Sequence, residues 1–413
     1  MPSLSLPARV RLRAGGPVFW LLTGQLIMFV GVAAIFPVAP LYVARRGGGS
    51  LAIAAFVAGP LLANAIVQVP AGRLADRVGR RPLLIGSRAG YAVLAMVLFA
   101  DVGPLWVLAV LRMLQGICAG VYVPALRAAL TDLSSPGERA TRFSQMQACE
   151  MVGLLVGPAL GGAAALWRDS AAFGIAGVAM LIGLVPMSRV PETRAAPPAA
   201  EHRVTFRWWR ERGIVVPALG LVAIGAVFSM YDVVWPQYLS ARGNSAFVIG
   251  LSISLFAVPI LALARAGGRL SDRVDRRRLV PAAMLITAAC AASYPLLRSL
   301  PVILTIGTVE AIGYVVLEPS LFAIIGDNAP EHERGRAMGV GGFAQFGGSA
   351  FGALVLGALY GVREGVPFWS GAFSLVLAAA VCALALPRRG RVTPSTPTLE
   401  PLPTLPMREG EPV

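Results

Sequence analysis

Twelve apolar stretches, each long enough to cross a lipid bilayer, take up most of this 413-residue sequence. A helix needs about 20 mostly apolar residues to span the hydrocarbon core. The sequence therefore predicts an all-α integral membrane protein with twelve transmembrane helices. The predicted spans cover residues 17–43, 50–70, 82–101, 104–130, 141–166, 170–187, 213–239, 246–266, 279–299, 301–325, 336–361 and 367–386.

The composition excludes an ordinary water-soluble protein. Of all residues, 56% are hydrophobic and 14% are charged, whereas soluble domains carry about 25% charged residues. All 36 basic side chains are arginines, and they lie in short clusters between the apolar stretches. A strongly basic chain can bind nucleic acid, but basic clusters at the ends of spans are typical of a topology signal. We therefore predict contact with membrane lipid and no nucleic-acid partner.

The arginines also predict how the chain crosses the membrane. With both termini in the cytoplasm, the inner segments hold 28 arginines and the outer loops hold 6. Cytoplasmic loops of membrane proteins carry the excess of basic residues. The sequence thus predicts a multi-pass protein of a bacterial-type cell (inner) membrane with cytoplasmic termini. Its first apolar stretch is longer than a signal-peptide core, so no cleaved leader is expected.

The second half of the chain repeats the first. The segment GRLADRVGRR at 72–81 returns as GRLSDRVDRR at 268–277, and Asp132 returns as Asp327 at nearly the same spacing. Such a repeat predicts two pseudo-symmetric six-helix bundles with a site at their interface, near the bilayer midplane. The predicted organisation is an N-terminal half at 1–187, a cytoplasmic linker at 188–212, a C-terminal half at 213–386 and a disordered tail at 387–413.

Three motifs lie in the first half. They are Gly72-x-x-x-Asp76-Arg77-x-Gly79-Arg80-Arg81 after the second span, Arg112-x-x-Gln115-Gly116 in the fourth, and Gly153-x-x-x-Gly157-Pro158-x-x-Gly161-Gly162 in the fifth. Gly72 and Gly79 permit close backbone approach and unusual dihedral angles in a tight turn. Glycines spaced by four let helices pack closely in lipid, and proline bends a helix. Packing alone and a gating role both explain the third motif.

With these motifs the chain resembles the major facilitator superfamily over nearly its whole length apart from the tails. The third motif resembles that of the drug:proton antiporter group. The resemblance implies that Asp76 meets the start of the eleventh span. It also implies that Arg80 pairs with Asp132, and that these contacts latch the two halves in an outward-open state.

The second copy of the first motif departs from the pattern at one position. Its latch residues are Asp272 and Asp327, but Asp275 stands where the first copy has Gly79. An equivalent latch in the second half is therefore a weaker expectation. Alternatively, the arginines of both copies only determine how the chain is oriented in the membrane.

Ionisable residues inside spans are costly and mark functional sites. Arg88 lies near the inner end of its span, and we expect it to extend toward the lipid headgroups. The resemblance places Arg112 in a proton-transfer apparatus. The candidates for proton coupling are Arg112, Glu150, Asp232, Glu310 and Glu318.

Three of these acids break the internal symmetry. At the positions equivalent to Asp232, Glu310 and Glu318, the first half has Phe36, Gln115 and Val123. Symmetric packing does not explain such a difference. Glu310 and Glu318 are about 80° apart on a helix, so both can line one cavity wall at different depths. Removal of a carboxyl group from water favours its neutral form, which suits proton uptake, although a purely structural ion pair stays possible for each.

Polar and aromatic side chains are predicted to complete a substrate cavity. Aromatic residues of spans are more often packing or interface residues, so packing is the alternative for each of them. The candidates are Gln25, Tyr122, Tyr231, Trp235, Gln237, Tyr314, Phe343 and Gln345.

Together these features predict a monomeric, proton-coupled secondary transporter that exports lipophilic drugs or other small molecules by alternating access. The alternatives are a proton-linked transporter of a specific metabolite such as a sugar, and a sensor that binds without transport. No P-loop appears, and the chain has no lysine to complete one. We predict no enzymatic activity, no cofactor and no metal site. The two histidines lie in polar connectors, and the four cysteines form no CxxC pair.

Overall fold

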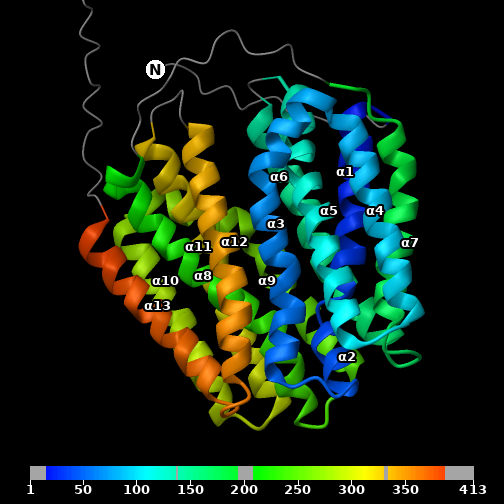
Figure 1. Ribbon diagram of the computed structural model, residues 1–413. Helices are drawn as coiled ribbons and strands as arrows, with labels where there is room; N and C mark the ends of the chain where they lie inside the picture. Colours follow the sequence, from blue (N-terminus) through cyan, green and yellow to red (C-terminus); the bar gives the residue numbers. More distant parts are fainter. Residues whose placement is uncertain (1–14, 136–137, 194–207, 330–333, 387–413) are drawn as a thin grey trace, which may run out of the picture.

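The computed structural model describes residues 15–135, 138–193, 208–329 and 334–386, and within these ranges every regular element is a helix (Figure 1). The predicted tail at 387–413 and most of the predicted linker lie outside the described residues. The first half comprises α1 (Pro17–Ala34), α2 (Ala39–Arg45), α3 (Ser50–Val78), α4 (Arg80–Ala100), α5 (Leu105–Asp132), α6 (Arg139–Ala164) and α7 (Ala171–Ser188). The second comprises α8 (Arg212–Ser240), α9 (Ala246–Arg273), α10 (Arg276–Ser293), α11 (Leu300–Asn328), α12 (Arg334–Leu359) and α13 (Val366–Ala385), with short 3₁₀ turns η1 (Trp208–Arg210) and η2 (Tyr294–Leu296).

The helices confirm the predicted all-α membrane fold. In the described part of the chain, 11 spans are long and apolar enough to cross a membrane. The remaining long helix, α6, carries Arg139, Arg142 and Glu150 and packs between α1 and α9. The first predicted span is divided into α1 and α2. Pro37 lies between them, and a proline disfavours helical geometry at the residue before it.

Helix pairs recur in the two halves. In the first half α1 packs on α6 and α7, α3 on α5, and α4 on α5 and α7. In the second, α8 packs on α12 and α13, α9 on α11, and α10 on α11 and α13. Figure 1 shows the first half on the right and the second on the left. The halves meet mainly through α6 against α9 and α3 against α12, so the predicted pseudo-symmetry is present in the packing.

The glycines of the third motif lie where backbones approach closely. A Cβ atom on Gly161 would lie 1.8 Å from the carbonyl oxygen of Ala34, and one on Gly157 would lie 2.5 Å from that of Val30. Gly162 faces the other half, since its Cβ would lie 2.3 Å from the carbonyl oxygen of Ala246. The motif therefore joins α6 to α1 within its half and to α9 across the interface.

We expect the Gly161→Ala variant to destabilise the protein, because the added methyl group meets backbone atoms that cannot rotate away. Overpacking of this kind costs about 1–3 kcal/mol. The matched control is Gly86→Ala in α4, where a Cβ would meet no described atom within 4 Å. Alanine favours a helix interior over glycine by up to about 1 kcal/mol. Thermal unfolding in detergent measures both; equal melting temperatures for the two variants would contradict the close contact.

Contacts between the halves include the ends of helices remote from residues 72–81. We call the end with residues 72–81 the motif end, and the other the far end. At the far end a Cβ on Gly357 of α12 would lie 3.0 Å from the Cβ of Ala54, and one on Gly361 would lie 2.8 Å from the Ser50 hydroxyl. Together with the contact between Gly162 and Ala246, these two contacts hold the halves against each other at the far end.

Candidate functional site

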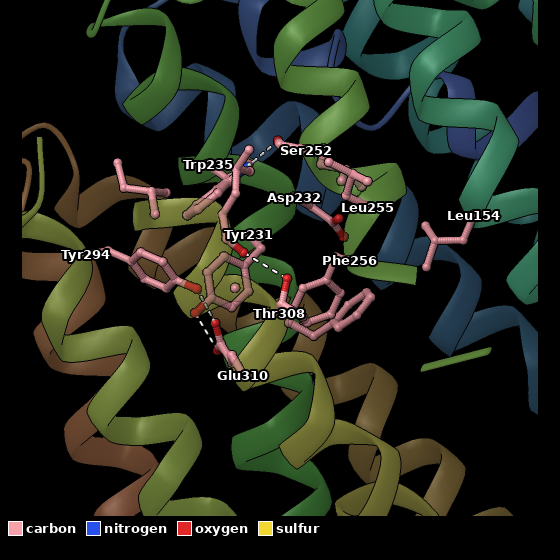
Figure 2. A pocket seen from close by; sticks show the side chains of 15 residues that line it. Leu154, Tyr231, Asp232, Trp235, Ser252, Leu255, Phe256, Tyr294, Thr308 and Glu310 are labelled. Carbon is pink, nitrogen blue, oxygen red and sulfur yellow. Dashed lines mark hydrogen bonds between the residues drawn. The ribbon is translucent and has the colours of Figure 1, made fainter. Parts of the chain in front are cut away.

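A cavity lies among α8, α9 and α11 (Figure 2). Tyr294 of η2 borders it, and Leu154 of α6 is its single contribution from the first half. The sequence predicts a site at the interface of the halves, whereas this cavity lies almost wholly inside the second half. Its lining residues belong to the end of α8 and the beginnings of α9 and α11, so it occupies the part of the bundle toward the far end.

Helical spacing brings the lining residues together. Phe228, Tyr231, Asp232 and Trp235 follow the spacing of three and four residues that places side chains on one face of α8. From α9 and α11, Ser252 with Phe256 and Gly307 with Glu310 complete facing surfaces at the same spacing. Four further lining residues are not predicted from the sequence: Tyr294, Ser252, Phe256 and Thr308. A lone serine or threonine in an apolar helix is only a weak signal, and nothing in the pattern distinguishes Tyr294.

Glu310 is held by two tyrosines. Its side chain is fully buried, and its two carboxylate oxygens each accept a hydrogen bond of 2.6 Å, from the hydroxyls of Tyr231 and Tyr294. Hydrogen bonds to an ionised acceptor are stronger than neutral ones, so the two tyrosines favour the carboxylate form. In a protonated Glu310 these two hydrogen bonds would be weaker, neutral ones. Charge on Glu310 is therefore linked to the contact between α8, which carries Tyr231, and η2.

Asp232 occupies the other side of the cavity. Figure 2 shows the Asp232 side chain near Leu255 and Phe256, apart from Glu310 and its two tyrosine partners. Within the described part of the chain, Asp232 has no hydrogen bond or ion pair, and its side chain is half-buried. Among the residues that the structure describes, no arginine lines the cavity. Asp232 thus presents a carboxyl group without a described partner to whatever enters the cavity.

Aromatic rings fix the remaining wall. The Trp235 indole donates to the Ser252 hydroxyl at 2.9 Å, stacks on Tyr238 at 5.8 Å and meets Tyr294 edge-on at 5.0 Å. Tyr231 also packs edge-on against Trp235 and Tyr294. Their polar groups are already paired, so these rings offer flat apolar faces in a fixed geometry.

Other predicted cavity residues lie elsewhere. Tyr314 packs between Phe228 and Phe256, behind the lining, and its buried hydroxyl has no partner in the described ranges. Gln237 donates to the Val233 carbonyl of its own helix at 2.8 Å. Phe343 is 64% exposed on α12.

A hydrogen-bonded chain crosses four helices of the first half. Arg88 of α4 donates to the Gly24 carbonyl and to the Tyr122 hydroxyl at 2.7 Å. Tyr122 donates to Gln25 at 3.1 Å, and Gln25 donates to the Glu150 carboxylate at 2.8 Å. The predicted extension of Arg88 to the headgroups is wrong. Arg88 is 1% exposed, because Gly24 and Tyr122 supply partners inside the bundle.

Glu150 faces Glu318 across the interface of the halves. The two carboxylates are close enough for their charges to interact, and Arg127 lies near Glu150. The Gln345 side chain lies near Glu318. Glu318 does not line the cavity that holds Glu310. The two acids of α11 therefore belong to separate surroundings.

Arg112 is remote from these acids. Its guanidinium donates to the Gln115 side chain at 2.8 Å and lies over the rings of Phe56 and Phe173, at 5.6 and 6.0 Å from their centroids. Cation–π contact stabilises a cation in an apolar environment. No described carboxylate lies within salt-bridge distance of Arg112, so the structure does not bring it together with the other proton-coupling candidates.

At the motif end, the same ion pair occurs in both halves. Arg80 lies 3.3 Å from Asp132, and Arg276 lies 2.6 Å from Asp327. Each pair joins helices of one half and does not bridge the two halves. Arg77 is exposed. The side chains of the predicted latch residues Asp76 and Asp272 lie outside the described residues.

Helix capping explains why the two motif copies differ. Gly79 has a φ of 106°, and a Cβ there would lie 2.7 Å from the Glu192 carboxylate. That carboxylate accepts from the backbone N–H groups of Arg80 and Arg81 at the start of α4. In the second half, Asp275 itself accepts from the Arg277 N–H at the start of α10. An acid caps the helix in both copies, supplied from another segment in the first and from the Gly79-equivalent position in the second.

Gly72 plays a different part from the one predicted. It lies within α3, and a Cβ there would meet no described atom within 4 Å. Among the residues that the structure describes, no group of three His, Cys, Asp or Glu side chains is placed to hold a metal ion.

Known proteins resemble this chain in both sequence and fold. The model of the family described as Major Facilitator Superfamily matches residues 21–216 and 217–409, one match for each half. The class C tetracycline resistance protein of Escherichia coli is 29% identical over 346 residues, which cover 79% of this chain and 84% of that protein. Multidrug resistance protein 1 of Bacillus subtilis is 23% identical over 373 residues, 87% of this chain and 94% of that protein. A crystal structure of a D-xylose–proton symporter superposes with a TM-score of 0.72 at 16% identity, covering 90% of this chain and 98% of the symporter.

Proposed function

The chain belongs to the Major Facilitator Superfamily, and we propose that it exports lipophilic cations or neutral small molecules in exchange for protons. It is a multi-pass membrane protein of a transporter family and not an enzyme. The similarity to tetracycline and multidrug resistance proteins supports export of drug-like molecules. The arginine-rich motif end is the cytoplasmic side in this proposal, as the positive-inside rule favours.

The cavity carries the proposal because its described lining residues combine two carboxyl groups with aromatic walls and include no basic side chain. Asp232 can attract a cation, and the faces of Trp235 and Tyr231 suit an aromatic or quaternary cation. An anionic cargo would meet repulsion from both acids. A sugar needs many free hydrogen-bonding groups, but Tyr231 and Trp235 are already paired with Glu310 and Ser252. These observations favour a lipophilic cargo over a sugar.

Proton exchange follows from the different settings of the two acids. We assign the coupling proton to Glu310 and the contact with cargo to Asp232. Proton uptake by Glu310 replaces its charge-assisted hydrogen bonds to Tyr231 and Tyr294 with weaker neutral ones. This change weakens the link between α8 and η2 and removes one negative charge from the cavity. Both changes weaken the hold on a cation, so proton uptake from outside promotes cargo release.

Alternating access requires the closed far end to open. The contacts of Gly162 with Ala246 and of Gly357 with Ala54 would separate as the halves rock. The ion pairs Arg80–Asp132 and Arg276–Asp327 hold each half together at the motif end, so the halves can move as two bodies. Glycine-lined contacts suit this motion because they contain few side chains that must rearrange.

An efflux assay in bacterial cells lacking their own drug pumps tests the proposal. We expect cells that express the chain to expel lipophilic cationic dyes, and a protonophore to stop this export. A panel that includes an organic anion and a sugar gives the comparison. Export of the sugar or the anion but not of the cations, or efflux that persists with the protonophore, would overturn the assignment.

A further inference from the structure

Two residues that line the cavity, one on α9 and one on α11, are exposed at the surface of the bundle. Most of its lining is buried or half-buried, but Leu255 of α9 is 43% exposed and Thr308 of α11 is exposed. Leu304, one helical turn before Thr308, is half-buried. The wall of the cavity on this side therefore consists of surface residues of two neighbouring helices, Leu255, Leu304 and Thr308, which we call the rim.

The rim faces lipid rather than the path between the halves. On α9, Leu251, Leu255 and Val258 form one exposed apolar stripe, whereas Gly250 and Ser254 face α6 of the other half. On α11, Val302, Val309 and Ile312 are exposed. Exposed apolar stripes on membrane-spanning helices are surfaces for lipid tails.

The rim is apolar in chemistry as well as in position. The Thr308 hydroxyl donates to the Leu304 carbonyl at 3.0 Å, so its hydrogen-bonding need is met within α11 and its methyl group is left for apolar contact. Thr308 lies about 12 Å along α11 from its far-end start, at 1.5 Å per residue. At this depth the rim meets the hydrocarbon tails of one leaflet.

Behind the apolar rim lie two acids. Asp232 and Glu310 line the same cavity, and none of its described lining residues is basic. A molecule that enters through lipid needs a large apolar part, and one that then stays gains from a positively charged group. Amphipathic cations meet both requirements, since they dissolve in a leaflet near its surface and carry a charge for Asp232.

We infer that the cavity exchanges amphipathic cations directly with the bilayer through an opening at the rim, between α9 and α11, in the leaflet toward the far end. The inference deepens the proposed function by giving the cargo a lipid route. Leu255 and Thr308 form the exposed part of the rim of this opening, and Asp232 selects for positively charged molecules.

Cysteine labelling tests the route without any transport step. Ile303 is fully buried on the cavity wall, so Ile303→Cys, in a chain whose four native cysteines are replaced by serine, reports access to the interior. In proteoliposomes, we expect a long-chain N-alkylmaleimide dissolved in the bilayer to label this cysteine. A sulfonated, membrane-impermeant maleimide, which stays in the aqueous phase, should not label it. Equal labelling by the sulfonated reagent would overturn the lipid route.

Bulky residues at the rim locate the opening. We expect Leu255→Trp and Thr308→Trp each to slow labelling by the alkylmaleimide about tenfold, and the neighbouring exposed controls Leu251→Trp and Val309→Trp to change it by no more than about twofold. Two rim variants are used so that, if one of them misfolds, the other still tests the position of the opening. Slowing by the controls equal to that by the rim variants would place the route elsewhere.

Two ions of the same shape test the charge preference. Tetraphenylphosphonium should protect the cysteine at position 303 from the alkylmaleimide, and tetraphenylborate should not. Equal protection by both would overturn selection for cations. The labelling pattern is independent of proton coupling. If no proton-driven export is found but the pattern holds, the proposed function fails and the opening stands; if export is found but the pattern is absent, the reverse follows.

Discussion

Replacement of Glu310 by glutamine is expected to abolish transport driven by a pH gradient while leaving the fold intact. Glutamine has nearly the same shape, and its carbonyl and amide groups can still meet the hydroxyls of Tyr231 and Tyr294. An amide, however, does not carry a proton at physiological pH. Uptake of a permanently charged aromatic cation into proteoliposomes with an acidic lumen measures the effect. Such a cation cannot be trapped by protonation, so protein-free liposomes give the background to which the variant should fall.

The matched control for this variant is Glu364→Gln. Glu364 forms an ion pair with Arg242 at the far end, and its side chain is 42% exposed. Exposed pairs contribute less than about 1 kcal/mol to stability, so this change should leave gradient-driven uptake near that of the unaltered protein. Thermal unfolding of both variants checks the fold. Retention of gradient-driven uptake by Glu310→Gln would remove Glu310 from the coupling mechanism.

Replacement of Asp232 by asparagine should weaken the binding of cations and leave that of neutral cargo nearly unchanged. The carboxylate lies in the cavity without a partner in the described part of the chain, so a bound cation supplies its main electrostatic contact. Interactions of this type with a charged group contribute about 1.5–3 kcal/mol, equivalent to roughly a 10- to 150-fold rise in Kd. Equilibrium binding of tetraphenylphosphonium and of an uncharged analogue of similar size gives the comparison. An equal loss for both ligands would indicate a structural role for Asp232.

Much of the scaffold could be predicted because lipid leaves few alternatives. A run of about 20 apolar residues in a bilayer forms a helix, so the helices follow from hydropathy. Glycines spaced by four predict close contact, and Gly157, Gly161 and Gly162 indeed lie against backbone atoms. The recurrence of Asp132 as Asp327 also corresponds to a recurring ion pair, with Arg80 and Arg276 as partners.

Contacts between helices far apart in the sequence could not be predicted in the same way. The chain from Arg88 through Tyr122 and Gln25 to Glu150 joins α4, α5, α1 and α6, and no spacing in one sequence gives the relative rotation of four helices. For the same reason, Glu310 and Glu318 fall into separate surroundings although they share a helix. Tyr294 follows α10 as an ordinary aromatic residue, and its role depends entirely on the position of α11.

The asymmetry between the halves was the most informative feature of the sequence. The second half has Asp232 and Glu310 where the first half has Phe36 and Gln115, and both of these acids line the cavity. Arg112 shows the limit of transferring a role by motif alone. An arginine stands at this position, as the motif requires, but its side chain contacts Gln115 and two phenylalanine rings and none of the candidate acids.

Exchange of cargo for protons is the central claim, and the direction of proton movement tests it most directly. Proteoliposomes with a pH-sensitive dye in the lumen, and with potassium and valinomycin to clamp the membrane potential, receive a permanently charged aromatic cation on the outside only. The account predicts that the lumen becomes more alkaline as cargo enters and protons leave, and that Glu310→Gln abolishes this change. Acidification of the lumen, or entry of cargo without any change in lumenal pH, would contradict it.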